Sequence, residues 1–174
     1  MCAKEIESFE ERKPRERKPK SAEQALTALM RLCARSEKSS GDALRLMRVW
    51  EVAECERQGV LQKLIDQRFI DDRRYAEAYT REKSSLAGWG ERKIALQLRQ
   101  KGVARDIIVE VLASINGDEQ SQRLVDKLSR KMRSTKAASE YKLRGKLLRY
   151  ALSLGYDYDV AIEAIGRVIS ERAE

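Results

Sequence analysis

Histidine is absent from the 174 residues of this chain, and cysteine, proline and aromatic residues are scarce. The lack of histidine removes the commonest general base and metal ligand. Three cysteines occur at Cys2, Cys33 and Cys55, widely spaced and with no CxxC pair. This spacing argues against a disulfide framework and against a zinc site. We therefore expect the cysteines to be small residues in or near a reducing interior.

Motifs of nucleotide and metal chemistry are missing as well. Neither GxxxxGK[ST] nor GxGxxG occurs in the chain. The carboxylate pairs Asp71/Asp72 and Asp157/Asp159 are explained more simply as helix caps than as metal ligands. We expect no catalytic residue, no cofactor and no bound metal, and hence a protein that is not an enzyme.

Long apolar segments are also lacking. No apolar run approaches the roughly 20 residues that cross a bilayer, and residues 1–20 have no apolar core of the kind that a secretory signal contains. We expect a cytoplasmic protein without a membrane partner, and a monomer.

Proline occurs only at Pro14 and Pro19, so after Lys20 nothing forces a helix to end. The rest of the chain is rich in Ala, Leu, Arg, Lys, Glu and Gln, which favour helix. This composition predicts an all-α fold. Residues 1–20 mix charges of both signs with few apolar residues, which is typical of a flexible arm.

One pattern recurs along the chain. Residues 101–112 and 154–165 agree in glycine, aspartate, glutamate and apolar spacing, and Gly102 and Gly155 lie 155 − 102 = 53 positions apart. A weaker copy carries Glu51 in place of glycine, 102 − 51 = 51 positions earlier. A fixed long period is typical of stacked units that bury their apolar stripes against neighbours. At Glu51 we expect the left-handed turn to be costlier or differently shaped.

Apolar periodicity and turn residues divide the chain into three units of three helices, at residues 21–70, 71–116 and 117–174. Ser21 with Gln24 resembles a capping box, and Asp71 and Asp72 suit a helix N-terminus. The nine predicted helices are 21–35, one that ends near residue 50, 53–67, one from the paired aspartates at 71–72 to about residue 84, 91–101, 105–115, 119–133, 140–153 and 157–172.

The net charge of +8 is concentrated in one segment. Residues 123–149 hold ten cations and two anions, 10 − 2 = +8, and the remaining 26 cations and 26 anions balance. This footprint is expected for a protein that binds a polyanion or an acidic protein surface. A solvated helix face explains it equally well.

Helical spacing places many of the cations opposite the apolar stripes. Arg92 and Arg99 share one such face, and Lys142, Lys146 and Arg149 share another. The residues that we predict to contact a protein partner or nucleic acid are Arg92, Lys93, Arg99, Lys101, Arg123, Lys127, Arg130, Lys131, Lys142, Lys146 and Arg149.

Three aromatic residues, Tyr75, Tyr79 and Trp89, could stack on nucleic-acid bases. Tyr75 and Tyr79 are four positions apart, which favours packing on one helix face. Trp89 lies between two glycines and is the better candidate for exposure, although packing is slightly favoured there too.

Residues 69–79, with the sequence FIDDRRYAEAY, are followed by GERKI at 90–94 and LQLRQKGV at 96–103. This combination resembles the RecX family of recombinase regulators, and the likeness covers roughly residues 22–172. The departures are Glu51 and a longer basic segment at 130–139. The resemblance implies an elongated, curved array of three-helix units. It also implies a protein that binds the RecA filament on single-stranded DNA and suppresses its assembly, ATP hydrolysis, strand exchange and coprotease activity.

Two other functions remain open at this point. The chain could be a free-standing DNA-binding module in which the middle helix of a unit enters a groove of duplex DNA. It could also be a helical scaffold for an acidic partner.

Overall fold

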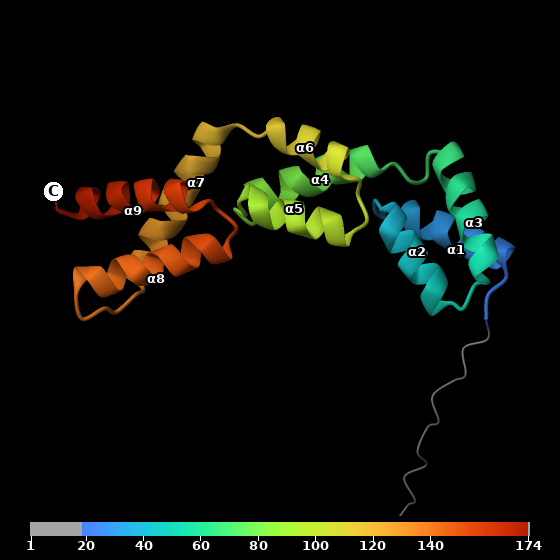
Figure 1. The fold of residues 1–174 in the computed structure, drawn as a ribbon, viewed down its shortest axis with the longest axis horizontal. Coiled ribbons are helices and arrows are strands. Elements are labelled where there is room, and N and C mark those ends of the chain that lie inside the picture. The colour runs from blue at the N-terminus through green and yellow to red at the C-terminus, as the bar shows by residue number, and fades with distance from the viewer. Residues whose placement is uncertain (1–18, 174) are drawn as a thin grey trace, which may run out of the picture.

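The computed structural model describes residues 19–173, and every regular element in that range is an α-helix. The helices are α1 (Ala22–Cys33), α2 (Ser40–Val49), α3 (Glu54–Asp66), α4 (Asp72–Ser85), α5 (Glu91–Gln100), α6 (Arg105–Ala113), α7 (Gly117–Arg133), α8 (Glu140–Ser153) and α9 (Tyr158–Ala173). The all-α prediction is confirmed, whereas the predicted arm lies outside the described residues apart from its last two. Figure 1 shows the helices as an elongated, curved row of three groups, α1–α3, α4–α6 and α7–α9.

Each group of three helices, called a unit below, encloses its own buried cluster of side chains. The clusters draw on residues 25–70, 75–111 and 124–168. Equivalent positions keep the sequence period: Met47, Leu98 and Ala151 of the middle helices are fully buried, with spacings of 98 − 47 = 51 and 151 − 98 = 53. The repeat in the sequence is therefore a repeat of packing environments.

Local signals set most helix starts. Ser21 and Gln24 form the expected capping box on α1, and the Asp71 side chain accepts a hydrogen bond from the Arg74 amide at the start of α4. These bonds satisfy amide groups that have no partner within the helix. Asn116 caps α7, so this helix includes Gly117 and begins two residues earlier than predicted.

The turn after each middle helix has the same left-handed conformation. Gly102 has a φ of 77° and Gly155 a φ of 89°, and Glu51 adopts a φ of 55° although it has a side chain. A non-glycine residue in this region costs about 1–2 kcal/mol. The first unit therefore keeps the shape of the turn at an energetic cost.

The second and third units join where the start of α5 meets the end of α8. The Gly90 amide donates to the Leu154 carbonyl at 2.8 Å, and the Arg92 amide donates to the Gly155 carbonyl at 3.2 Å. A Cβ atom at Gly90 would lie 2.4 Å from the Gly155 oxygen. Glycine is required at position 90 because two backbones meet there.

The first and second units join in the same way, with the start of α2 against the end of α5. The Ser39 hydroxyl donates to the Lys101 carbonyl at 2.7 Å, and a Cβ atom at Gly41 would lie 2.3 Å from that oxygen. At both junctions the first turn of one middle helix packs against the last turn of the next middle helix in the chain. The middle helices α2, α5 and α8 thus form a head-to-tail series along the row.

The middle helix of the third unit is one turn longer than the other two. Helix α8 has 14 residues, whereas α2 and α5 have 10 each. Its N-cap, Ser139, precedes the left-handed glycine by 155 − 139 = 16 positions, against 102 − 90 = 12 for Gly90 in the second unit. This extra turn, residues 139–142, extends beyond the point at which the earlier middle helices receive a neighbour.

Candidate partner-binding surface

The eleven cations predicted from the sequence fall into two groups by exposure. Lys93, Lys101, Arg123 and Lys127 are half-buried. The exposed ones are Arg92, Arg99, Arg130, Lys131, Lys142, Lys146 and Arg149. Only the exposed group can present its full charge to a partner.

Three of the eleven already have carboxylate partners within the protein. Lys101 pairs across the first junction with Asp42, with its Nζ atom 3.1 Å from Oδ1. Arg92 pairs across the second junction with Asp157. Arg123 pairs with Glu119, one turn earlier on α7, at 2.7 Å, and its guanidinium also reaches the Ser84 hydroxyl of the second unit. These side chains hold units together, and part of their charge is neutralised.

Lys93 and Trp89 form a cation–π contact at the second junction. The Lys93 Nζ atom lies 4.5 Å from the centre of the Trp89 ring and donates to the Ser153 carbonyl at 3.1 Å. Lys83, which sequence reasoning missed, lies 5.6 Å from the same ring. Trp89 packs against the cores of both the second and the third units. The packing interpretation of Trp89 is therefore the one that the structure supports.

The tyrosines of α4 also pack. Tyr75 is buried and stacks on Tyr79 with ring centres 5.9 Å apart. Burial raises the pKa of Tyr75 to about 12. Because Tyr75 is buried and Tyr79 stacks on it, this pair is packed within the protein and is not a platform for bases.

Glu91, in the first turn of α5, is an acidic residue at the same junction. Burial, and after it the negative charge of Asp157, raises the pKa of this carboxyl. Arg92 next to it neutralises part of the Asp157 charge. The second junction is thus a network of charges within the protein, in which Arg92 and Asp157 are paired with each other and remain exposed.

Helix α7 exposes its cations unevenly. A Cβ atom at Gly88 would lie 1.9 Å from Cε of Lys127, so the Lys127 stem packs over the turn before α5. The Lys131 Nζ atom lies 5.4 Å from the centre of the Tyr150 ring. Arg130 is exposed beside it. The outer end of α7 is therefore the more available part of that helix.

Helix α8 carries the densest group of available cations. Lys142 and Arg149 are exposed and have no ion-pair partner in the described part of the chain, and Lys146 is exposed with its Nζ atom bonded to the Lys136 carbonyl at 2.6 Å. Arg144, which the sequence argument did not single out, pairs with Glu140 at 2.8 Å. Sequence reasoning had counted its charge without placing it on a binding face.

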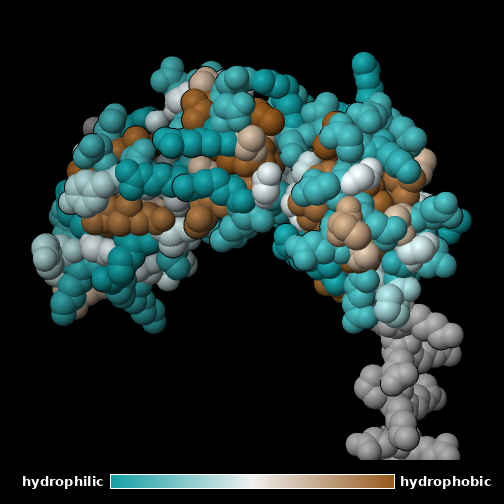
Figure 2. Space-filling model, turned by 45° about the vertical axis from the view of Figure 1, so that its right-hand side comes forward, coloured by the Kyte–Doolittle hydropathy of each residue, from teal (hydrophilic) through white to brown (hydrophobic). Residues whose placement is uncertain are grey.

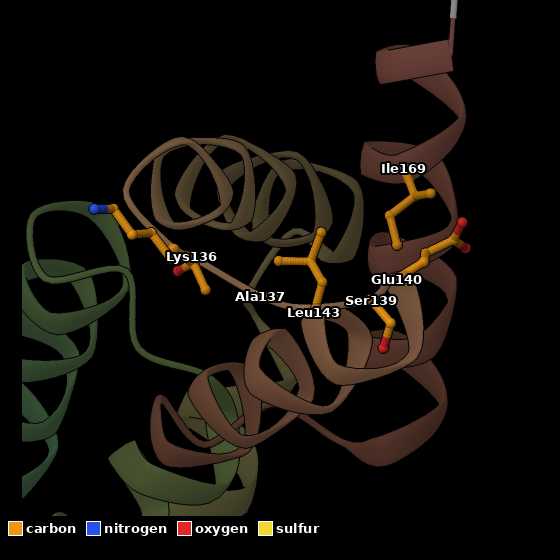
Figure 3. A pocket seen from close by; sticks show the side chains of 7 residues that line it. Lys136, Ala137, Ser139, Glu140, Leu143 and Ile169 are labelled. Atoms are coloured by element: carbon orange, nitrogen blue, oxygen red, sulfur yellow. The ribbon is translucent and has the colours of Figure 1, made fainter.

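A pocket of about 610 Å³ lies where the segment after α7 enters α8. Figure 3 shows Lys136 pointing away from Glu140 and Ile169, which line the opposite side. Because its polar groups do not converge, this pocket has no arrangement suited to chemistry or to one small ligand. A second hollow of about 550 Å³ lies between α8 and α9.

Figure 2 shows the row of units as an arch, with hydrophilic residues over most of the visible face and apolar patches at both ends. No described helix is long and apolar enough to span a membrane. Within residues 19–173, no three acidic or cysteine side chains gather as metal ligands would.

Comparisons with known proteins point to one family. The family model for the second three-helix domain of RecX matches residues 71–112. A curated regulatory protein RecX from Clostridium botulinum (strain Eklund 17B / Type B) is 34% identical over 104 residues, which cover 59% of this chain and 48% of the relative. One from Mycobacterium sp. (strain KMS) is 32% identical over 110 residues, 61% of this chain and 60% of the relative. The chain thus spans about half the length of the clostridial relative.

Solved structures extend the likeness to the fold. The crystal structure of RecX from Lactobacillus salivarius superposes with a TM-score of 0.71 at 22% identity, over 84% of this chain and 96% of that one. A crystal structure titled regulatory protein RecX gives a TM-score of 0.71 at 22% identity, over 82% and 71% of the two chains.

The fold and its surface define a class: an array of tandem three-helix units with exposed cations on its third unit. Within that class, the matched domain, the curated relatives and the superposed crystal structures all support one family, the RecX regulatory proteins.

Proposed function

We propose that this protein binds RecA recombinase filaments on single-stranded DNA and inhibits their assembly, ATPase, strand exchange and coprotease activities. It thereby modulates homologous recombination, the SOS response and DNA repair. It acts as a cytoplasmic monomer through steric and electrostatic contact, without catalysis. Likeness to the RecX family supports the partner, and the surface of the third unit supports the mode of contact.

The observation that carries the proposal is the uncompensated charge on α7 and α8. Arg130, Lys142 and Arg149 are exposed and lack an ion-pair partner in the described range. A filament on DNA offers both phosphates and acidic side chains, and Arg and Lys bind either group. These side chains all belong to the third unit, so this end of the arch is the part that we expect to contact the filament.

The head-to-tail junctions argue against a free-standing DNA-binding module. A recognition helix of the helix-turn-helix type contacts bases with its N-terminal residues. In α5 those residues are packed on Leu154 and Gly155, and in α2 they are packed on Lys101. Two of the three middle helices therefore have no free N-terminus with which to enter a DNA groove.

The test is a recombinase ATPase assay on single-stranded DNA, titrated with this protein. Inhibition is expected for the native chain, and the double variant Lys142→Glu/Arg149→Glu should weaken it at least about tenfold because charge attraction becomes repulsion. A matched control, Arg31→Glu/Lys63→Glu, changes two exposed cations of the first unit by the same amount of charge. Equal inhibition by both double variants would refute the assignment to the third unit.

The same titration separates two modes of inhibition. Inhibition at amounts far below the recombinase would indicate capping of filament ends, and a need for near-equal amounts would indicate occupation of the filament groove. Binding that involves phosphates should weaken steeply as salt rises. A protein that binds duplex DNA tightly without the recombinase would contradict the proposal.

A further inference from the structure

The hollow between α8 and α9 has an apolar lining in a region of high charge. Its volume is about 550 Å³. Its apolar and small lining residues are Tyr141, Gly145, Leu148, Tyr158, Ile162 and Ile165. Tyr141 is 86% exposed, Tyr158 55% and Ile162 44%. The third unit thus leaves an apolar strip at the edge of its core, where Tyr141, Tyr158 and Ile162 are exposed and Ile165 is buried. We call this strip the α8–α9 groove.

The groove follows helical spacing on both of its walls. On α8 the lining residues are at 141, 145 and 148, and on α9 they are at 158, 162 and 165. Each set has the i, i+4, i+7 spacing of one helix face. The core face of α8 is a different one, because it contains Leu143 and Leu147. Helix α8 therefore has a second apolar face beside its core face, on which Leu148 packs against the core and Tyr141 is exposed.

The equivalent positions of the second unit show that the fold does not require this second face. Counted from the shared glycine, 53 positions earlier, Gly145 corresponds to Arg92 and Tyr158 to Arg105. Leu148 corresponds to Ala95. Tyr141 belongs to the extra turn of α8, which has no counterpart in α5. Ile162 and Ile165 correspond to Val109 and Leu112, which are also apolar, so the α9 wall recurs in the second unit. The α8 wall, with the extra turn that carries Tyr141, is particular to the third unit.

The rim of the groove is cationic. Lys142, Arg144, Lys146 and Arg149 line it, and no carboxylate does. Arg144 is partly neutralised by Glu140, and Lys146 bonds to a backbone carbonyl. Lys142 and Arg149 have no such partner in the part of the chain that is described. A ligand must therefore combine apolar groups for the floor with negative charge for the rim.

We propose that the α8–α9 groove docks an acidic, amphipathic helical segment of a partner protein. Its floor at Leu148, Ile162 and Ile165 is aliphatic, which suits the apolar face of a helix laid into a groove. Single-stranded nucleic acid fits less well, because bases stack on aromatic rings and the two tyrosines flank an aliphatic floor. Acidic side chains of the segment pair with Lys142 and Arg149. The apolar contact is independent of the recombinase proposal.

Gly145 offers a substitution that blocks the groove without harming the fold. A Cβ atom there would meet nothing within 4 Å, so Gly145→Leu projects into open space and improves helix propensity. Gly59 in α3 has the same freedom, again with nothing within 4 Å. Gly59→Leu is therefore the matched control, and helix content by circular dichroism verifies that both variants fold.

The experiment selects phage-displayed peptides of about 12 residues, roughly three helical turns, on the native protein. Selected peptides should carry Asp and Glu together with apolar residues at i, i+3 or i+4 and i+7. Fluorescein-labelled copies should bind the Gly145→Leu variant at least about tenfold more weakly, and the Gly59→Leu variant within about twofold, by anisotropy. Ile162→Ser should weaken binding in the same direction because it makes the floor polar.

Three results would overturn the groove proposal. The first is that no acidic amphipathic sequences are selected, and the second is that the peptides bind the native protein and the Gly145→Leu variant equally well. The third is that oligo(dT) displaces the peptide and that its own binding is weakened to the same extent by Gly145→Leu. The last result would assign the groove to nucleic acid. Because the assay contains no recombinase, its outcome is separate from that of the ATPase titration.

Discussion

The Nζ atom of Lys101 lies 3.1 Å from Oδ1 and 3.2 Å from Oδ2 of Asp42, across the junction between the first two units. The Asp42 side chain is only 10% exposed and that of Lys101 33%. Arg45 also reaches Asp42, at 3.2 Å, but from a side chain that is 64% exposed. Lys101 is therefore the principal partner of a nearly buried carboxylate.

Replacing Lys101 by methionine should lower the free energy of unfolding by about 1–2 kcal/mol, because Asp42 is left with one exposed partner. Urea unfolding followed by circular dichroism measures this change. Arg99→Met is the control on the same helix, since Arg99 is exposed and bonds only to the Ala95 carbonyl of its own helix. Equal stabilities of the two variants would show that the Asp42 pair contributes nothing to the junction.

Gly90→Ala should destabilise the second junction by about 1–3 kcal/mol, because the new Cβ would lie 2.4 Å from the Gly155 oxygen and both neighbours are backbone. Gly59→Ala should instead stabilise the protein by up to about 1 kcal/mol, since its Cβ is unobstructed within 4 Å. Thermal unfolding compares the two. A Gly90→Ala variant as stable as the native chain would mean that the units separate without cost.

Thr80→Val should raise the free energy of unfolding by about 1 kcal/mol. The Thr80 hydroxyl is buried and has no hydrogen-bond partner, and Leu29 occupies the equivalent position of the first unit, 80 − 29 = 51 residues earlier. Thr27→Val, at an exposed position of α1, serves as the control and should change stability by less than about 0.5 kcal/mol. Destabilisation by Thr80→Val would reveal a hydrogen bond that this structure does not contain.

Stability should fall as pH rises from 10 to 12, and Tyr156 should contribute to that fall. Burial raises the pKa of Tyr156 from 10.0 to about 12, although the charge of Arg123 opposes the shift. The unfolded chain therefore loses the phenol proton first, and its ionisation draws the equilibrium toward unfolding. Alkaline unfolding monitored at 222 nm should shift to higher pH in Tyr156→Phe. Tyr141→Phe, at an exposed ring, should leave the midpoint unchanged.

Most of the fold was predictable because its signals are local. The capping box at Ser21 and the cap at Asp71 involve residues three positions apart, and the buried stripe that contains Leu98 follows helical periodicity. The predicted start of α7, residue 119, is two residues too late. Asn116 and Gly117 are typical of a turn, whereas in the structure the Asn116 side chain caps a helix that includes Gly117. Because Glu51 has a side chain, we predicted a turn that is energetically costlier or differently shaped than at the glycines. The φ angle of Glu51 is nevertheless left-handed, as at Gly102 and Gly155.

The candidate surface was less predictable from the sequence. Arg92 occupies an outward position of α5 by periodicity and Lys101 follows its last residue, yet each meets a carboxylate of a neighbouring unit. The partners are 157 − 92 = 65 and 59 residues away in the chain. Periodicity describes one helix at a time, so it cannot show that the end of a middle helix adjoins the start of another.

The sequence by itself determined the helices, most of their boundaries and the three-unit period, because caps, glycines and apolar spacing act over a few residues. The tertiary structure decided which cations are neutralised within the protein and which remain available, and it revealed the α8–α9 groove. The physical reason is that the effective charge and exposure of a side chain depend on neighbours through space, and head-to-tail packing of the units brings those neighbours together.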